Sequence, residues 1–200
     1  MKSFLNLLLS LSVLFGCQPK AAADSPAPDT FGGKIAKAAH ARIGQTKSYD
    51  GSYRSLAYPN GDVPNELGVC TDVVIRALRP NGFDLQKLVH LDMKRSFGSY
   101  PKIWGLRRTD RNIDHRRVPN LRTFFKRKGW QLPLKKDPSR FQPGDLVTCT
   151  VSGNLPHIMV VSWKKSPSGH PLVVHNIGMG TMATDDLFTY PLTGHYRVKK

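Results

Sequence analysis

The strongest constraint on the fold is a change in hydrophobic spacing near Pro138. Before this point, apolar residues recur at the three- and four-residue intervals of amphipathic helices. After it they form short runs bounded by turn residues, as in strands. The spacing predicts helices over residues 34–43, 70–78, 83–93 and 120–128, the last capped by Asn120, and strands over 146–151, 157–163, 172–177 and 195–198. Helices followed by an antiparallel meander predict an α+β fold with two segregated halves.

The charge of the chain restricts its partners more than its size does. Its 200 residues, 40% of them hydrophobic, suit one globular domain with a substantial core. The net charge of +16 is unusual and favours anionic partners, such as nucleic acid, phospholipid headgroups or bacterial envelope polymers. Residues 94–136 hold fourteen lysines and arginines against only Asp110 and Asp114. This basic run is either a solvated face or the surface that contacts an anionic partner.

The N-terminus has the features of an export signal. A basic start precedes an apolar run from Phe4 to Phe15, which is too short for a permanent membrane-spanning helix. The run ends at Cys17, and residues 14–17 resemble a bacterial lipobox, which implies cleavage before Cys17 and its lipidation. Ordinary signal cleavage after the alanines at 21–23 is the alternative. We expect a signal peptide over residues 1–16, a flexible tether over 17–30 and a folded domain over 31–200.

Export narrows the partners that the charge allows. A glutamine rather than an aspartate follows Cys17, which in a Gram-negative cell favours sorting to the outer membrane. We therefore expect a periplasmic protein held at the membrane by an N-terminal lipid anchor, with an anionic envelope partner and no nucleic acid. The sequence does not define the oligomeric state.

Residues 68–78 place a cysteine at the start of an amphipathic helix. Val73 and Ala77 share one helical face, which can hold the helix start against a core. Cys70 then lies near unpaired N–H groups that favour a thiolate, which makes it a candidate nucleophile. The alternatives are an inert buried cysteine and, in an oxidising compartment, a disulfide with Cys149.

Two histidines on successive predicted strands are candidate partners for this cysteine. A cysteine nucleophile needs a base, and a third polar group commonly orients that base. His157 begins one strand, and antiparallel pairing can bring His175 beside it from the next. Asn176 is the alternative third group, because neighbouring strand residues face opposite sides and only one of the two can reach His157. No metal-ligand spacing is present, so we expect neither a metal nor a cofactor.

The ordered motifs resemble NlpC-type cell-wall cysteine peptidases. The segments that carry this resemblance are Gly68–Arg76, Pro143–Val147, His157-Ile158 and Val174-His175. Further segments look like the branch labelled domain of unknown function 1287, namely Gly61–Pro64, Asn112–Asn120, His175–Gly178 and Gly194–Arg197. The resemblance extends from about Gly33 to Arg197.

The resemblance implies a papain-like fold with Cys70 as nucleophile, His157 as base and His175 as the orienting group. Tyr58 lies roughly where the family keeps a tyrosine near the oxyanion. Such enzymes cleave amide bonds of peptidoglycan stem peptides, including the D-γ-glutamyl–diaminopimelate link. The family's Asp-Cys-Ser-Gly motif is altered here, since Val69 precedes the cysteine and Thr71-Asp72 follows it. A non-catalytic envelope-binding lipoprotein and a papain-like hydrolase or acyltransferase acting on another envelope substrate are the alternatives.

Overall fold

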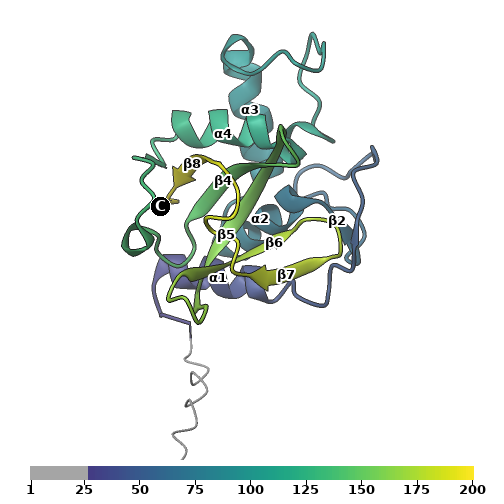
Figure 1. Ribbon diagram of the computed structural model, residues 1–200. Helices are drawn as coiled ribbons and strands as arrows, with labels where there is room; N and C mark the ends of the chain where they lie inside the picture. Colours follow the sequence, from purple (N-terminus) through teal and green to yellow (C-terminus); the bar gives the residue numbers. More distant parts are fainter. Residues whose placement is uncertain (1–26) are drawn as a thin grey trace, which may run out of the picture.

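In the computed structural model, which describes residues 27–200, helices come first and a six-stranded sheet follows (Figure 1). The helices are α1 (Phe31–His40), α2 (Cys70–Leu78), α3 (Leu85–Ser96) and α4 (Val118–Arg127). The sheet contains β3 (Gln131–Leu132), β4 (Leu146–Val151), β5 (Leu155–Lys165), β6 (Pro171–Asn176), β7 (Thr181–Thr184) and β8 (Leu192–Tyr196). Two short strands, β1 (Ser48–Tyr49) and β2 (Leu67–Gly68), form a separate parallel pair. This arrangement confirms the predicted α+β class.

The strand order of the sheet places the two candidate histidines on one face. The order is β3-β8-β4-β5-β6-β7, and the paired neighbours are antiparallel. On β5 and β6, Val160 lies opposite Val174. In this register His157 and His175 are diagonal neighbours, so their side chains project from the same face of the sheet.

Helix α2 is the central element of the core. All nine of its residues are buried, and it packs against α1, β5 and β6. Helices α1 and α2 lie side by side behind the strands in Figure 1. The helical side of the sheet buries Ile158, Val160 and Val174 against α2. Because each such side chain contributes roughly 1.5–3 kcal/mol when buried, this packing fixes the position of the helix start.

The opposite face of the sheet has its own apolar cluster. Cys149, Met159 and Val173 point to this side, where Leu187 and Phe188 from the segment after β7 cover them. The sheet therefore has a buried layer on both faces, and the side chains of His157 and His175 are shielded from solvent.

An aromatic cluster ties α4 to the sheet. The Trp130 ring lies 5.5 Å from Phe125 and 5.8 Å from Phe124, and Phe125 lies 5.3 Å from Tyr196 of β8. Aromatic pairs at these separations add about 0.5–1.5 kcal/mol each beyond their buried area. This cluster holds the C-terminal half of α4 against the sheet, and the first residues of the same helix form one wall of the candidate site.

The structure corrects the predicted start of the fourth helix. α4 begins at Val118, with Arg117 in the N-cap position and Pro119 in the first turn, where its missing N–H costs no hydrogen bond. Asn120 is therefore not the cap. It is buried inside the helix, and its side-chain amide donates to the carbonyl of Asp114 at 3.0 Å.

Other boundaries differ by a few residues. Helix α1 covers 31–40 rather than 34–43 because Thr30 caps it, accepting the N–H of Gly33 at 3.0 Å. Helix α3 ends at Ser96, and β8 covers 192–196 rather than 195–198. Strands β3 and β7 were not predicted. None of the helices within residues 27–200 is long and apolar enough to cross a membrane. The predicted lipidation at Cys17 and the signal peptide lie outside the described residues.

Candidate active site

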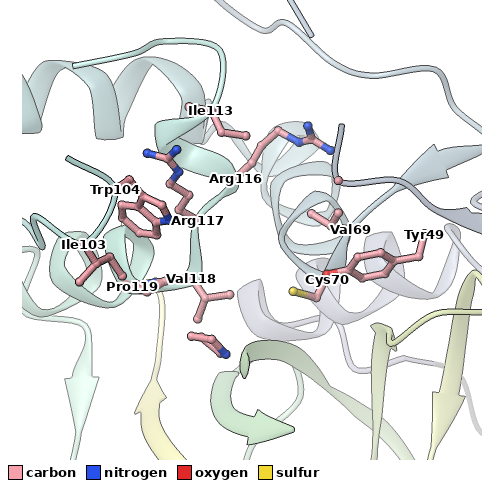
Figure 2. Close-up of a pocket in the computed structure, with 12 residues that line it drawn as sticks. Tyr49, Val69, Cys70, Ile103, Trp104, Ile113, Arg116, Arg117, Val118 and Pro119 are labelled. Carbon is pink, nitrogen blue, oxygen red and sulfur yellow. The ribbon is translucent and has the colours of Figure 1, made fainter. Parts of the chain in front are cut away.

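Cys70 is the first residue of α2 and lies at the wall of a pocket of about 330 Å³ (Figure 2). The Asp72 carboxylate accepts the N–H of Val69 at 2.7 Å, which fixes the first turn of the helix. The residue is only 3% exposed. In Figure 2 its sulfur points into the pocket, so a bound ligand can reach the thiol while bulk solvent largely cannot.

The surroundings of the thiol hold it in the protonated form. Burial raises the pKa of Cys70 to about 11, and the nearby Asp72 carboxylate adds to this effect. The N–H groups of Ile158 and Thr71 lie against the sulfur and act in the opposite direction without outweighing burial. The N–H groups at the helix start therefore favour the thiolate as expected, but burial outweighs them, and the resting group at neutral pH is a thiol.

The tyrosine beside the thiol is Tyr49, not Tyr58. The Tyr49 hydroxyl hydrogen-bonds to Cys70, and burial, followed by the nearby thiol, raises the pKa of Tyr49 to about 12. Its phenol is thus protonated at neutral pH and can donate a hydrogen bond into the site. Tyr58 instead packs its ring against His90, with centroids 5.4 Å apart, and against Arg111. Tyr49 is the last residue of the two-residue strand β1 and Tyr58 lies in the irregular segment after it, and sequence spacing carries no information about which one reaches the cysteine.

His157 and His175 form a buried hydrogen-bonded pair. The Nε2 of His157 lies 2.8 Å from the Nδ1 of His175. The Nε2 of His175 lies 2.8 Å from the hydroxyl of Thr184 and 3.6 Å from the carboxylate of Asp186. A polar chain therefore runs from the start of β5, across β6, to the residues at the end of β7.

Burial keeps both imidazoles neutral. It lowers the pKa of His157 to about 3, an effect to which the neighbouring His175 contributes. Burial also lowers the pKa of His175. The Asp186 carboxylate acts in the opposite direction on both rings. A neutral ring has one nitrogen that donates and one that accepts, so the pair can relay a preference for one tautomer.

The start of β5 runs beside the thiol, but the strand register turns the rings of His157 and His175 to the face of the sheet opposite α2, the face that also holds Cys149. The residues on either side of His157 both adjoin Cys70: the N–H of Ile158 lies against the sulfur, and Pro156 lines the same pocket. Within the described chain no direct hydrogen bond joins the thiol to the His157 ring. Since His175 engages Nε2, the nitrogen of His157 that remains for a nucleophile or a substrate is Nδ1.

Asn176 points to the other face of the sheet, as expected for adjacent strand residues. Its side-chain amide donates to the carbonyl of Gly68 at 2.9 Å and to that of Ser48 at 3.3 Å. It therefore anchors the chain two residues before Cys70 instead of contacting His157. Of the two alternatives for the third group, the residue in contact with His157 is His175.

Cys149 does not form a disulfide with Cys70. Both cysteines are free and buried. Cys149 belongs to the apolar cluster on the face of the sheet opposite the helices, whereas Cys70 belongs to the cluster that contains α2. Burial raises the pKa of Cys149 to about 12, so it is the inert cysteine of the pair.

A buried ion pair connects the Cys70 helix to the 112–120 motif, whose role the sequence did not reveal. The Arg116 guanidinium donates twice to the Asp72 carboxylate, at 3.0 and 2.9 Å, and both side chains are at most 4% exposed. Arg116 also donates to the carbonyl of Asp50 at 3.1 Å. Because the loop with Asp50 follows Tyr49, this arginine fixes the helix start and the tyrosine together.

The remaining motif residues brace the surrounding loops. Arg76 is buried and donates to the Asp62 carboxylate, which holds the segment before β2 against α2. Asp145 accepts hydrogen bonds from His195 and Arg197, each at 2.7 Å, and thereby ties the turn before β4 to the end of β8. Arg76, Asp145 and His195 are buried, whereas Asp62 and Arg197 are partly exposed, and their hydrogen bonds give all five a structural role.

The pocket has apolar walls and one cation besides Arg116. The set that lines it is Tyr49, Gly51, Val69, Cys70, Ile103, Trp104, Ile113, Arg116, Arg117, Val118, Pro119 and Pro156. The Arg117 guanidinium lies 4.1 Å above the Trp104 ring, across the pocket from the thiol (Figure 2). Within residues 27–200 no group of three or more histidine, cysteine or acidic side chains is arranged to hold a metal ion.

Comparison with known proteins places the chain in a family. A protein of Escherichia coli (strain K12), named Uncharacterized protein YijF, is 53% identical over 163 residues, which cover 82% of this chain and 80% of that relative. The solved structure of NlpC1 from Trichomonas vaginalis matches with a TM-score of 0.46 and 12% identity, over 85% of this chain and 45% of the Trichomonas chain. The family model described as Domain of unknown function (DUF1287) matches residues 36–198, and the protein belongs to that family.

Proposed function

We propose that the protein is an exported cysteine hydrolase that cleaves amide bonds of peptidoglycan stem peptides, the D-γ-glutamyl–diaminopimelate link among them. Cys70 is the nucleophile, His157 the base and His175 the group that orients the base. The observation that carries the proposal is the 2.8 Å contact between His157 and His175. His157 belongs to β5, and its two sequence neighbours, Pro156 and Ile158, adjoin the Cys70 thiol. A thiol, a neutral base and a group that orients the base are the components of acyl transfer.

The reaction starts from a neutral thiol and a neutral imidazole. As the sulfur of Cys70 attacks the scissile carbonyl, the thiol proton moves to Nδ1 of His157. The N–H of Cys70, in the unpaired first turn of α2, and the Tyr49 hydroxyl donate hydrogen bonds to the oxyanion. Collapse of this intermediate transfers the proton to the leaving amine and forms a thioester. Water, deprotonated by His157, then hydrolyses the thioester and restores the thiol.

The residues behind His157 select the tautomer that this mechanism needs. For Nδ1 to accept a proton, Nε2 of His157 must carry the hydrogen and donate it to Nδ1 of His175. His175 then carries its own hydrogen on Nε2, which faces the Thr184 hydroxyl and the Asp186 carboxylate. Both groups can accept that hydrogen bond. His175 is in this way a positioning residue, and Thr184 and Asp186 support it.

The substrate class rests on the sequence rather than on the site. The signal-like N-terminus and the lipobox support export to the periplasm, where a basic protein meets the anionic cell wall, and a lipid anchor at Cys17 that holds the protein to the outer membrane. The net charge of +16 favours retention of an anionic polymer over a neutral one. The motifs shared with NlpC-type peptidases favour amide bonds of stem peptides within that polymer.

The test is digestion of purified sacculi and isolated muropeptides, with products identified by mass spectrometry. Wild type is expected to release peptide fragments, and Cys70→Ala to release none, because the acyl acceptor is lost. Cys149→Ala is the matched control, since it removes the other buried cysteine, and it is expected to retain activity. Circular dichroism checks that both variants are folded. Normal turnover by folded Cys70→Ala protein would refute the mechanism.

A non-catalytic envelope-binding role is the second candidate. The raised pKa of Cys70 favours it, because a thiol that stays protonated is a poor nucleophile without a base. In that case wild type and Cys70→Ala protein bind sacculi equally and neither releases fragments. Release of a product other than a stem-peptide fragment, dependent on Cys70, would instead identify a hydrolase or acyltransferase for another envelope substrate.

A further inference from the structure

Arg117 is a charged side chain in the wall of the Cys70 pocket that the proposed mechanism does not use. It immediately precedes α4, and the aromatic cluster that fixes α4 also fixes its backbone. Its side chain is 18% exposed. In Figure 2 the guanidinium lies on the opposite wall of the pocket from the sulfur of Cys70. A ligand that reaches the thiol therefore passes close to this cation.

The guanidinium has no hydrogen-bond partner among residues 27–200, and its Nη1 is buried. The nearest carboxylate is that of Asp114, 3.8 Å from Nη1, which is beyond hydrogen-bond distance. Burial lowers the pKa of Arg117, and Asp114 only partly opposes this effect. A desolvated guanidinium with five unused donors is costly, and native proteins satisfy such groups with a partner.

Arg116, the adjacent arginine in this pocket, has hydrogen-bond partners within the protein. Arg116 donates to both oxygens of Asp72 and to backbone carbonyls, so its charge and donors are used within the protein. Arg117 instead places its guanidinium carbon 4.1 Å from the centroid of the Trp104 ring. This cation–π contact holds the guanidinium in place, and its N–H groups, which make no hydrogen bond with residues 27–200, remain available to a ligand.

We propose that Arg117, held in place by Trp104, is a subsite for a carboxylate carried by the substrate near its scissile bond. A planar carboxylate matches the planar fork of donors and can bind it through two parallel hydrogen bonds. The identification of the ligand as a substrate rests on the proposed function, whereas the existence of a carboxylate subsite does not. The subsite selects stem peptides whose carboxylate is free over the same peptides with that group amidated.

The experiment measures binding in the Cys70→Ala background, which excludes turnover. Two synthetic stem peptides that contain the D-γ-glutamyl–diaminopimelate link are compared, one with the glutamyl carboxylate free and one with it converted to a carboxamide. Isothermal titration calorimetry is expected to give about tenfold tighter binding of the carboxylate form, the scale of a charge-assisted bidentate pair. Adding Arg117→Gln is expected to abolish this preference and leave the affinity for the carboxamide unchanged. Arg117→Lys is expected to restore only part of it.

Arg107→Gln is the matched control, since this arginine lies in the same exposed loop as Trp104 but does not line the pocket. It is expected to keep the preference for the carboxylate. The inference is overturned if Arg117→Gln protein keeps the full preference, or if the Cys70→Ala parent shows none or binds neither peptide. Cleavage by the Cys70-containing protein is measured separately. If binding shows a carboxylate preference that depends on Arg117 but no cleavage occurs, the subsite is retained and the hydrolase proposal is rejected. If cleavage occurs without a carboxylate preference, the hydrolase proposal is retained and the subsite is rejected.

Discussion

At the scale of single residues, the site depends on two neutral groups rather than on a preformed ion pair. Burial raises the pKa of Cys70 to about 11 and lowers that of His157 to about 3. The order of these values means that proton transfer from thiol to imidazole is unfavourable until a substrate supplies an electrophile. The pocket thus protects the thiol from oxidation and alkylation when it is empty, and reactivity appears only in the complex.

This state predicts how the free protein reacts with iodoacetamide. Alkylation of Cys70 is expected to be slow at pH 6–7 and to accelerate with each pH unit up to about pH 11, because the reactive thiolate is the minority form below that pKa. Peptide mass mapping identifies the labelled cysteine, and Cys70→Ala protein gives the background from Cys17 and Cys149. A rate that is already constant between pH 5 and 7 would show a thiolate–imidazolium pair instead and contradict the neutral state.

At the scale of elements, sequence spacing predicted those parts that pack by a regular period. Helix α2 and strands β4, β5 and β6 are recognisable because their buried faces repeat every three to four or every two residues. The contact between His157 and His175 follows from the same regularity, since antiparallel neighbours in one meander share a face.

The parts that the sequence did not reveal depend on loops and on pairing between distant segments. Tyr49 reaches Cys70 because the short parallel pair β1–β2 and the bonds from Arg116 direct its loop, and neither feature has a period. The short strands β3 and β7 acquire strand geometry only by pairing with β8 and β6. The pKa of Cys70 differs from the expectation because burial depends on the whole core, whereas the helix N-terminus was the only influence visible in the sequence.

The buried pair of Asp72 and Arg116 predicts a large effect on stability. Replacing Arg116 with Met leaves the Asp72 carboxylate buried without its cation, which is expected to reduce the free energy of unfolding by about 3–5 kcal/mol. The exposed pair of Arg127 and Asp92 is the matched control, and Arg127→Met is expected to cost less than about 1 kcal/mol. Urea denaturation followed by tryptophan fluorescence measures both. Equal small losses in the two variants would show that Arg116 does not hold the helix start.

At the scale of the whole molecule, buried histidines link the fold to pH. His115, His157 and His175 are all buried, and burial lowers the pKa of each, to about 3 for the first two. In the unfolded chain the same groups titrate near 6.5. Between these values the unfolded chain binds protons that the folded protein does not. The stability from neutral histidines is therefore complete above about pH 6.5 and is lost as pH falls towards 3.

Asp114 acts in the opposite sense over part of the same range. Burial raises its pKa to about 6, so the folded protein holds a proton that the unfolded chain releases near pH 4. Its contribution is present at low pH and is lost as pH rises to about 6. The pH dependence of stability due to Asp114 thus offsets that of one histidine. The three histidines together outweigh Asp114, so the net stability falls on acidification.

The net result is a protein that is expected to lose stability when acidified from pH 7 to pH 5. Each buried histidine adds a slope of about 1.4 kcal/mol per pH unit, and Asp114 subtracts a slope of the same size. Urea denaturation at pH 7.5, 6 and 5 measures the slope. Asp114→Asn is expected to steepen the loss of stability per pH unit, because it removes the group that opposes the histidines. His115→Gln is expected to flatten it, because it removes one of the histidines that cause the loss. A free energy of unfolding that is unchanged between pH 7 and pH 5 in the wild type would mean that these histidines are hydrated and protonate in the folded state.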